Sequence, residues 1–170
     1  MSTRNGRERV RVQRSVLDRL TEDASAPGEP AQSDVYAMES LQRSVRRDLE
    51  ALLNARRRWR SWPAWCSELR LSPLGYGIPD FASGAFSDSA RREALRADVE
   101  STIRRFETRL SNVRVSLLDG KNRLEPSLRL RIEALLRAEP APAPVAFDTI
   151  VDPVSVVVRP PVETWGPRER

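Results

Sequence analysis

The segment from Ser87 to Leu118 constrains the fold most, because a helical pattern is followed by a strand pattern with almost no loop between them. From Asp88 to Leu110, apolar residues recur every three or four positions, which predicts an amphipathic helix. The members of this stripe are Leu95, Val99, Ile103, Phe106 and Leu110. From Asn112 to Leu117, apolar and polar residues alternate, which predicts a strand with one buried face. This order of elements indicates an α+β domain.

Two opposite charges, Glu107 and Arg109, stand at the junction between this helix and this strand. Two residues apart on a helix, their side chains point about 200° from each other, so we expect that they do not pair with one another. One hypothesis is an intramolecular network that ties the helix end to the Tyr76–Asp80 loop or to Arg47 and Asp48. The other hypothesis is a contact with a partner protein, because an Arg–carboxylate pair is strong when its geometry is fixed and partly desolvated.

A second amphipathic helix is predicted from Ser33 or Asp34, either of which is a suitable N-cap, to about Arg56. Its apolar stripe has helical spacing and is expected to face the core. The residues of the stripe are Met38, Leu41, Val45, Leu49, Leu52 and Leu53. Arg56, Arg57 and Arg58 are expected at the C-terminal end of this helix, where cations suit the helix dipole.

The formal net charge of +5 is concentrated in one segment. Residues 43–60 carry seven Arg against two acids, which accounts for the whole excess, and the rest of the chain is close to neutral. Within it, Arg56–Trp62 combines arginines with Trp59 and Trp62, a composition typical of protein interfaces and of nucleic-acid grooves. The structural alternative is a solvated helix end with tryptophan packed beneath a loop. Nucleic-acid binding is the least favoured, because no wider basic excess supports it.

Residues 59–87 are rich in proline and glycine, which argues against long regular structure there. Pro63–Leu69 is expected to form one or two helical turns. Leu74–Phe81 is expected to form a structured loop that Gly77 and Pro79 lock and that Tyr76 and Ile78 pack. The loop residues singled out are Tyr76, Gly77, Pro79 and Asp80.

The C-terminal half carries further strand patterns after Asp119-Gly120, a turn signal. We predict strands at residues 128–132, 145–151 and 154–158, with Pro140, Pro142 and Pro144 forming an extended spacer. The fold class is therefore α+β, with two amphipathic helices packed on one face of a small three- to four-stranded, mostly antiparallel sheet.

Composition excludes several classes of function. The chain has no histidine, which removes the commonest general base and metal ligand. Cys66 is the single cysteine, so neither a disulfide nor a cysteine-based zinc site can form within one chain. No apolar run approaches the roughly 20 residues of a membrane helix, and the N-terminus lacks an apolar signal region. We expect a soluble, cytoplasmic protein without a cofactor.

Three regions are predicted along the chain. Residues 1–34 are expected to form a flexible arm, residues 35–158 the folded domain, and residues 159–170 a disordered tail. Within the arm, residues 15–20 form an apolar patch that includes Leu17 and Leu20. A six-residue apolar patch cannot bury itself, so it is either tucked onto the domain or offered to a partner.

Five segments, in this order, carry a resemblance to a known family: residues 15–20, 48–56, 76–80, 106–115 and 147–149. In these segments the chain resembles TssE-type baseplate subunits of type VI secretion systems, which belong to the phage baseplate wedge "lysozyme-like" family. The family usually has Glu-Pro-Arg at the helix–strand junction, where this chain has Thr108. Proline would end the helix at that point, whereas Thr108 is expected to let it continue to Leu110.

The resemblance implies a structural, non-enzymatic subunit at the cytoplasmic face of the inner membrane. It implies docking on a wedge that contains TssF, TssG and TssK, and templating of the TssB–TssC sheath. The implied wedge contacts are Glu107, Arg109, Leu17, Leu20, Arg56, Arg57 and Trp59. A free strand edge accepts strands of another chain through main-chain hydrogen bonds, and the candidate edge comprises Val154, Val156 and Val158.

Two functions of other classes remain as alternatives. The first is an arginine-rich adaptor that binds nucleic acid. The second is a peptidoglycan hydrolase, for which Glu107 would need a second carboxylate from Asp80, Asp88 or Glu100 across a sugar-binding cleft. No spacing in the sequence selects one of these three acids, so the hydrolase is the weaker alternative.

Overall fold

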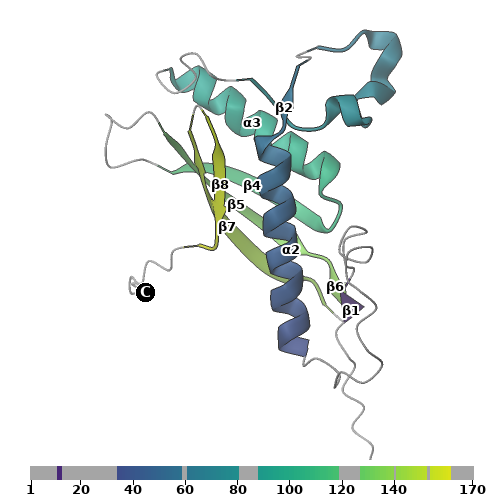
Figure 1. Cartoon of the computed structure of the whole chain (residues 1–170), viewed down its shortest axis with the longest axis vertical. Helices are drawn as coiled ribbons and strands as arrows, with labels where there is room; N and C mark the ends of the chain where they lie inside the picture. Colours follow the sequence, from purple (N-terminus) through teal and green to yellow (C-terminus); the bar gives the residue numbers. More distant parts are fainter. Residues whose placement is uncertain are drawn as a thin grey trace, which may run out of the picture.

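The computed structural model describes residues 11–12, 34–58, 61–80, 88–118, 127–139, 141–152 and 154–161 (Figure 1). Most of the described residues belong to helices and strands. In chain order these elements are β1 (Arg11–Val12), α2 (Asp34–Asn54), β2 (Arg56–Arg57), η1 (Ala64–Arg70), η2 (Pro73–Gly75), β3 (Ile78–Pro79), α3 (Ser89–Phe106), β4 (Leu110–Leu118), β5 (Leu128–Leu136), β6 (Ala138–Glu139), β7 (Ala143–Val151) and β8 (Val156–Arg159).

The main sheet has the strand order β4-β5-β7-β8, and every neighbouring pair is antiparallel. Burial alternates along β5, where Leu130 and Ile132 are fully buried while Arg129 and Glu133 are exposed. Such alternation is what a sheet with one covered face and one wet face requires. The predicted α+β class with a small antiparallel sheet is confirmed.

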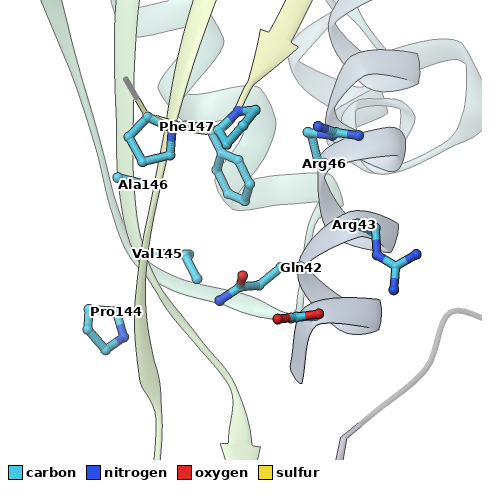
Figure 2. A pocket seen from close by; sticks show the side chains of 10 residues that line it. Gln42, Arg43, Arg46, Pro144, Val145, Ala146 and Phe147 are labelled. Atoms are coloured by element: carbon cyan, nitrogen blue, oxygen red, sulfur yellow. The ribbon is translucent and has the colours of Figure 1, made fainter. Parts of the chain in front are cut away.

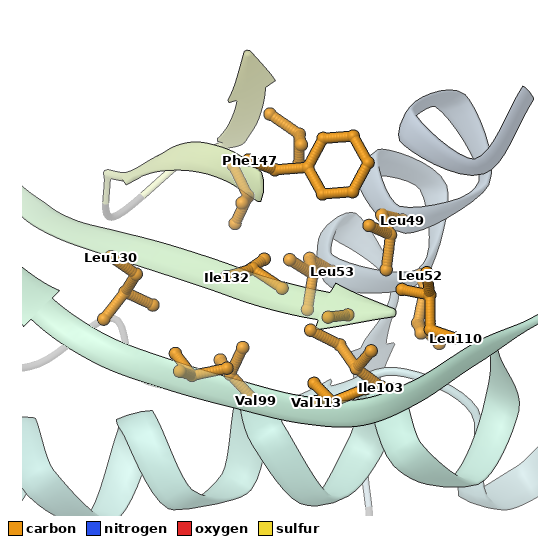
Figure 3. Close-up of a cluster of buried hydrophobic side chains, with 14 of the residues drawn as sticks. Leu49, Leu52, Leu53, Val99, Ile103, Leu110, Val113, Leu130, Ile132 and Phe147 are labelled. Carbon is orange, nitrogen blue, oxygen red and sulfur yellow. The ribbon is translucent and has the colours of Figure 1, made fainter. Parts of the chain in front are cut away.

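The helices cover the apolar face, and Figure 3 shows side chains of α2, α3 and the sheet meeting in one core. The predicted stripe of α2 is buried, with Met38 partly so. In α3, Leu95, Val99 and Ile103 are buried. The helix begins as predicted, because the side chain of Asp88 accepts a hydrogen bond from the Ala90 N–H at 3.0 Å. Each fully buried leucine or isoleucine contributes about 1.5–3 kcal/mol, so these stripes hold the fold.

The end of α2 differs from the prediction. The helix ends at Asn54, and Arg56 and Arg57 form the short strand β2, which pairs in parallel with β3. The Ile78 N–H donates to the Ala55 carbonyl at 3.0 Å, which draws the loop against the chain just after the helix. Gly77 permits this approach, because it has a φ of 96° and a Cβ there would collide with the Ala55 carbonyl.

The end of α3 also differs from the prediction. The helix stops at Phe106, and Glu107 is non-helical with φ −103° and ψ 84°. A hydrogen bond of 3.2 Å from the Leu110 N–H to the Glu107 carbonyl closes a tight turn, and Leu110 is buried as the first residue of β4. The expectation that Thr108 lets the helix continue to Leu110 is therefore wrong. The turn into the sheet ends the helix without a proline.

The proline run is not only a spacer, because Pro144 lies within β7 and is paired with Leu135 of β5. A proline cannot donate to the ladder, so a sheet tolerates it where one side of a strand is open. β8 pairs with β7 only over residues 148–151, so the other side of β7 at Pro144 is not covered by β8. Within the arm that was expected to be flexible, Arg11 and Val12 form β1, which pairs antiparallel with β6.

Side chains of the two helices bond to the main chain of both outer strands. On β4, the Val115 N–H donates to Oε2 of Glu100 at 3.1 Å, and the Val115 carbonyl accepts from Arg96 at 3.1 Å. On β8, the Val156 N–H donates to Oδ1 of Asn54 at 2.9 Å, and Nδ2 of Asn54 donates to the Val156 carbonyl at 2.8 Å. In each case a helix supplies the donor and acceptor that a neighbouring strand would otherwise supply.

Candidate functional site

The junction between α3 and β4 brings its two charges together. Nε of Arg109 donates to Oε1 of Glu107 at 2.7 Å, and Nη2 donates to Oε2 at 2.5 Å. The Arg109 N–H also donates to the same carboxylate at 3.2 Å. The expectation that these residues do not pair is wrong, because it assumed helical spacing where the chain has already left the helix. A bidentate pair of this kind fixes the shape of the turn.

Helix α2 holds this pair from the other side. Nη2 of Arg109 donates to Oδ2 of Asp48 at 2.7 Å, and Nη1 donates to the Ser44 hydroxyl at 3.2 Å. Asp48 accepts in addition from Arg47 at 3.1 Å. We call Ser44, Asp48, Glu107 and Arg109 the junction network. Of the intramolecular contacts that the sequence suggested, the one to Asp48 is present, and Arg47 in turn donates to Asp48.

The Glu107–Arg109 pair is almost closed to solvent, since Glu107 is 6% and Arg109 is 8% exposed, whereas Ser44 and Asp48 are partly exposed. Burial lowers the pKa of Arg109, but the hydrogen bonds and charge of Glu107, followed by those of Asp48, outweigh burial and raise this pKa above its ordinary value. Two carboxylates thus face one guanidinium, and a buried charge of this kind is stable only when it is paired.

The loop of residues 76–80 borders the same region. The Tyr76 ring meets the Phe106 ring edge to face at 5.4 Å between centroids. Burial raises the pKa of Tyr76, and the charges of Asp48 and then Glu107 raise it further. Gly77 is buried, Pro79 lies in β3 and Asp80 is exposed.

Three of the carboxylates considered for glycoside hydrolysis, Glu107, Asp88 and Glu100, have other roles in the structure. Both oxygens of Glu107 accept from Arg109, and Asp88 caps α3. Glu100 accepts from Arg96 at 2.8 Å and from Arg104 at 2.7 Å. These contacts give no support to the peptidoglycan hydrolase alternative.

The structure describes only part of the predicted arginine segment at residues 56–62. Arg57 is 9% exposed, while Arg56 is half-buried and has a pKa that burial lowers and the charge of Asp80 raises, with a lower value as the result. Trp59 lies outside the described residues, as do Leu17 and Leu20 of the arm. Three exposed apolar side chains in the following segment were not singled out from the sequence, although a tryptophan among prolines and glycines was a usable signal. They are Trp65, Leu71 and Leu74.

The three valines of the predicted sheath edge do not share one environment. Val154 precedes β8 and is 90% exposed, whereas Val156 and Val158 are buried in the core. β8 is nevertheless an outer strand of the sheet, as predicted for residues 154–158. Asn54 already bonds the main chain of Val156, a contact that sequence reasoning missed because residues 54 and 156 are far apart in the chain.

Beyond the end of β8, a cavity of about 430 Å³ lies between α2 and β7 (Figure 2). It opens where β7 has no pairing with β8, since their ladder stops at Asp148 and Arg159. Its walls combine polar side chains of α2 with β7 and the prolines after β8. The lining residues are Glu39, Gln42, Arg43, Arg46, Pro144, Val145, Ala146, Phe147, Pro160 and Pro161.

Comparisons with known proteins agree with this architecture. No helix of the described residues has the length and apolar character to cross a membrane. A search of curated proteins finds no match to the sequence. A family model described as baseplate wedge protein gp25 matches residues 39–141, more than half of the chain, including most of α2, all of α3, β4 and β5, and the junction network. The chain therefore belongs to the gp25 family of baseplate wedge proteins, which is also the family of TssE, and its role is a structural one in a baseplate.

Proposed function

We propose that this protein is the TssE-type subunit of a type VI secretion baseplate, located at the cytoplasmic face of the inner membrane. In this proposal it docks on a wedge of TssF, TssG and TssK and presents a template for the TssB–TssC sheath. The observation that carries the proposal is the family match over residues 39–141. The match ends before β7 and β8, so the sheath contact rests on the strand order of the sheet.

For the wedge contact we propose the junction, together with Arg56, Arg57, Trp59 and the Leu17–Leu20 patch of the arm. Glu107 and Arg109 are buried, so in this proposal they set the shape of the turn, and the exposed Thr108 at its tip meets the wedge. A rigid turn loses little conformational entropy on binding, which favours such a contact.

For the sheath contact we propose strand addition at the outer side of β8, with Val154 at its start. Because Val156 directs its N–H and carbonyl to Asn54, antiparallel geometry directs those of Val158 to the same open side. An incoming strand would therefore pair with Val158 and displace the side chain of Asn54.

The wedge contact is tested with the full chain and purified TssF–TssG and TssK from the same organism. Thr108→Arg adds bulk and charge at the exposed tip of the turn, and we expect it to weaken binding about tenfold or more with an unchanged melting temperature. Ser116→Arg, an equally exposed change on β4, is the matched control and should bind normally. The proposal fails if the unaltered chain does not bind these subunits, and the junction contact fails if Thr108→Arg binds normally.

The sheath contact is tested by adding TssB–TssC to assembled baseplates and counting sheath tubes by electron microscopy. Baseplates with this chain should start tubes, and baseplates with Val154→Asp should start far fewer, because an unpaired charge would be buried beside the added strand. Ser116→Asp serves as the control. Equal numbers of tubes with and without the chain would rule out templating.

A further inference from the structure

Side chains of α3 close the outer side of β4. The Val113 carbonyl accepts from Nε and Nη2 of Arg104, at 3.2 and 2.7 Å. Two residues further on, the Val115 N–H donates to Oε2 of Glu100 and the Val115 carbonyl accepts from Nη1 of Arg96, each at 3.1 Å. We call Arg96, Glu100 and Arg104 the edge triad. Three main-chain groups that a further strand would need at this edge are therefore already bonded.

The members of the edge triad also hold one another in place. They are spaced four residues apart on α3, so their side chains lie on the same face of the helix. Nη1 of Arg96 donates to Oε2 of Glu100 at 2.8 Å, and Nη2 of Arg104 lies 2.7 Å from Oε1. Nε of Arg96 also donates to Glu93 at 2.6 Å. Displacing Glu100 from β4 would therefore disturb three charge-assisted contacts together, two with guanidinium groups and one with a main-chain N–H.

One neutral side chain covers the corresponding side of β8. Oδ1 of Asn54 accepts from the Val156 N–H at 2.9 Å, and Nδ2 donates to the Val156 carbonyl at 2.8 Å. Nδ2 also donates to the Glu50 carbonyl, one turn back in α2, at 2.8 Å. Asn54 is exposed, and all three of these partners are uncharged main-chain groups. Hydrogen bonds between neutral groups are roughly half as strong as those with an ionised partner, so β8 is covered more weakly than β4.

The two bonds of Asn54 to β8 have the form of a strand pairing. In an antiparallel pair, a residue of the added strand gives one N–H and one carbonyl to the residue opposite. The Asn54 carboxamide gives the same donor and acceptor to Val156, so an added strand would replace two bonds by two of the same kind. At β4, by contrast, an added strand would replace bonds of ionised groups and leave Glu100 and its two arginines without their main-chain partners.

We infer that the edge triad determines which outer strand of the main sheet accepts a strand of a partner protein. It keeps β4 closed and leaves β8, where the side chain of Asn54 is displaced, as the strand that the partner extends. This inference rests on the proposed function and deepens it, because it names the residues that make strand addition specific for β8. Asn54 yields to the partner strand, whereas the edge triad does not.

The first experiment measures amide hydrogen exchange by NMR in the full chain alone. After correction for intrinsic rates, we expect the Val156 N–H to exchange about tenfold faster than the Val115 N–H or more, because the weaker cover opens more often. Glu100→Gln keeps the shape of the side chain and removes its charge, so it should raise the exchange rate of Val115 severalfold and leave Val156 unchanged. Arg91→Gln, at an exposed position of α3, should change neither rate. Equal rates at Val115 and Val156, or no effect of Glu100→Gln at Val115, would overturn the inference.

The second experiment locates the added strand by hydrogen exchange and mass spectrometry on baseplates with and without sheath subunits. In the unaltered chain, the sheath should protect residues 154–159 and leave residues 110–118 unchanged. A triple variant that combines Arg96→Gln, Glu100→Gln and Arg104→Gln should gain protection at residues 110–118 as well, because uncharged side chains can be displaced as Asn54 is. Arg91→Gln is the control and should behave like the unaltered chain. The melting temperature of each variant shows whether it folds.

Two results of this second experiment would overturn the inference. One is protection of residues 110–118 in the unaltered chain, and the other is a folded triple variant that the sheath protects only at residues 154–159. If the triple variant does not fold, Glu100→Gln takes its place with the same two outcomes. If the sheath protects neither segment, the sheath contact of the proposed function is wrong, and the exchange rates of the chain alone then decide whether the edge triad keeps β4 closed.

Discussion

Arg109 of the junction network and Arg57 of β2 are both buried, but only Arg109 is paired with acids. Arg109 is 8% and Arg57 is 9% exposed, so both bury a guanidinium to a similar degree. Arg109 has two carboxylates from its own chain, whereas Nε of Arg57 has no hydrogen-bond partner. The difference teaches that a buried arginine supports the fold where the chain supplies acids for it, so the two residues should contribute to stability with opposite signs.

Removal of the Glu107 carboxylate from the junction network should have the largest effect on stability. Glu107→Ala leaves Arg109 buried with only Asp48 and Ser44, and we expect the free energy of unfolding to fall by about 3 kcal/mol. Chemical denaturation with an unchanged m-value measures it. Glu133→Ala, on the exposed face of β5, should change stability by less than about 0.5 kcal/mol. A loss below about 1 kcal/mol at Glu107 would break the comparison, because the pair would then not support the fold.

Removal of the buried charge of Arg57 should act in the opposite direction. Arg57→Met keeps the apolar stem and removes an unpaired guanidinium, so we expect the free energy of unfolding to rise by about 1 kcal/mol. The same denaturation experiment measures it, and Arg109→Met is the matched variant, for which stability should fall. Were Arg57→Met to destabilise the protein as much as Arg109→Met, the two sites would not differ in kind.

A proline in place of Thr108 tests the backbone geometry of the turn at the junction. Thr108 is the second residue of the turn that the Leu110–Glu107 hydrogen bond closes, a position that favours proline. We therefore expect Thr108→Pro to keep the junction network and to stabilise the protein by about 0.5 kcal/mol through the unfolded chain. Differential scanning calorimetry measures this gain. A clear loss would show that the turn found here depends on threonine.

The smallest effect concerns pH. The pKa of Tyr76 is raised by burial and by the charges of Asp48 and Glu107, so its neutral form is favoured in the folded state. A raised pKa contributes stability that is fully present below the unfolded value of about 10 and is lost as pH rises through the folded value. Tyr76→Phe should remove this alkaline loss and leave the neutral range little changed. Parallel pH profiles of both proteins above pH 10 would contradict the coupling between the loop and the junction network.

The helices and strands follow from sequence patterns, and parts of the sites do not. The apolar stripe at Leu41–Leu53 and the alternation at Leu128–Ile132 were sufficient to predict a helix and a strand. Burial of one face determines the spacing of apolar residues in both kinds of element. The pairing of Glu107 with Arg109 was missed because helix geometry was applied one turn too far. Nothing in the sequence indicated that Arg57 is buried, since β2 has only two residues and Arg57 pairs with Pro79, 22 positions later in the chain.

The bonds of Asn54, Arg96 and Glu100 to the outer strands have a consequence for the behaviour of the purified protein. Exposed strand edges are the templates on which sheet proteins stack into ribbons and precipitate as their concentration rises. Here Val115 and Val156 offer no unbonded main-chain groups to a second copy. Loss of the Asn54 carboxamide should therefore first lower the concentration at which the protein precipitates, before any change in the core.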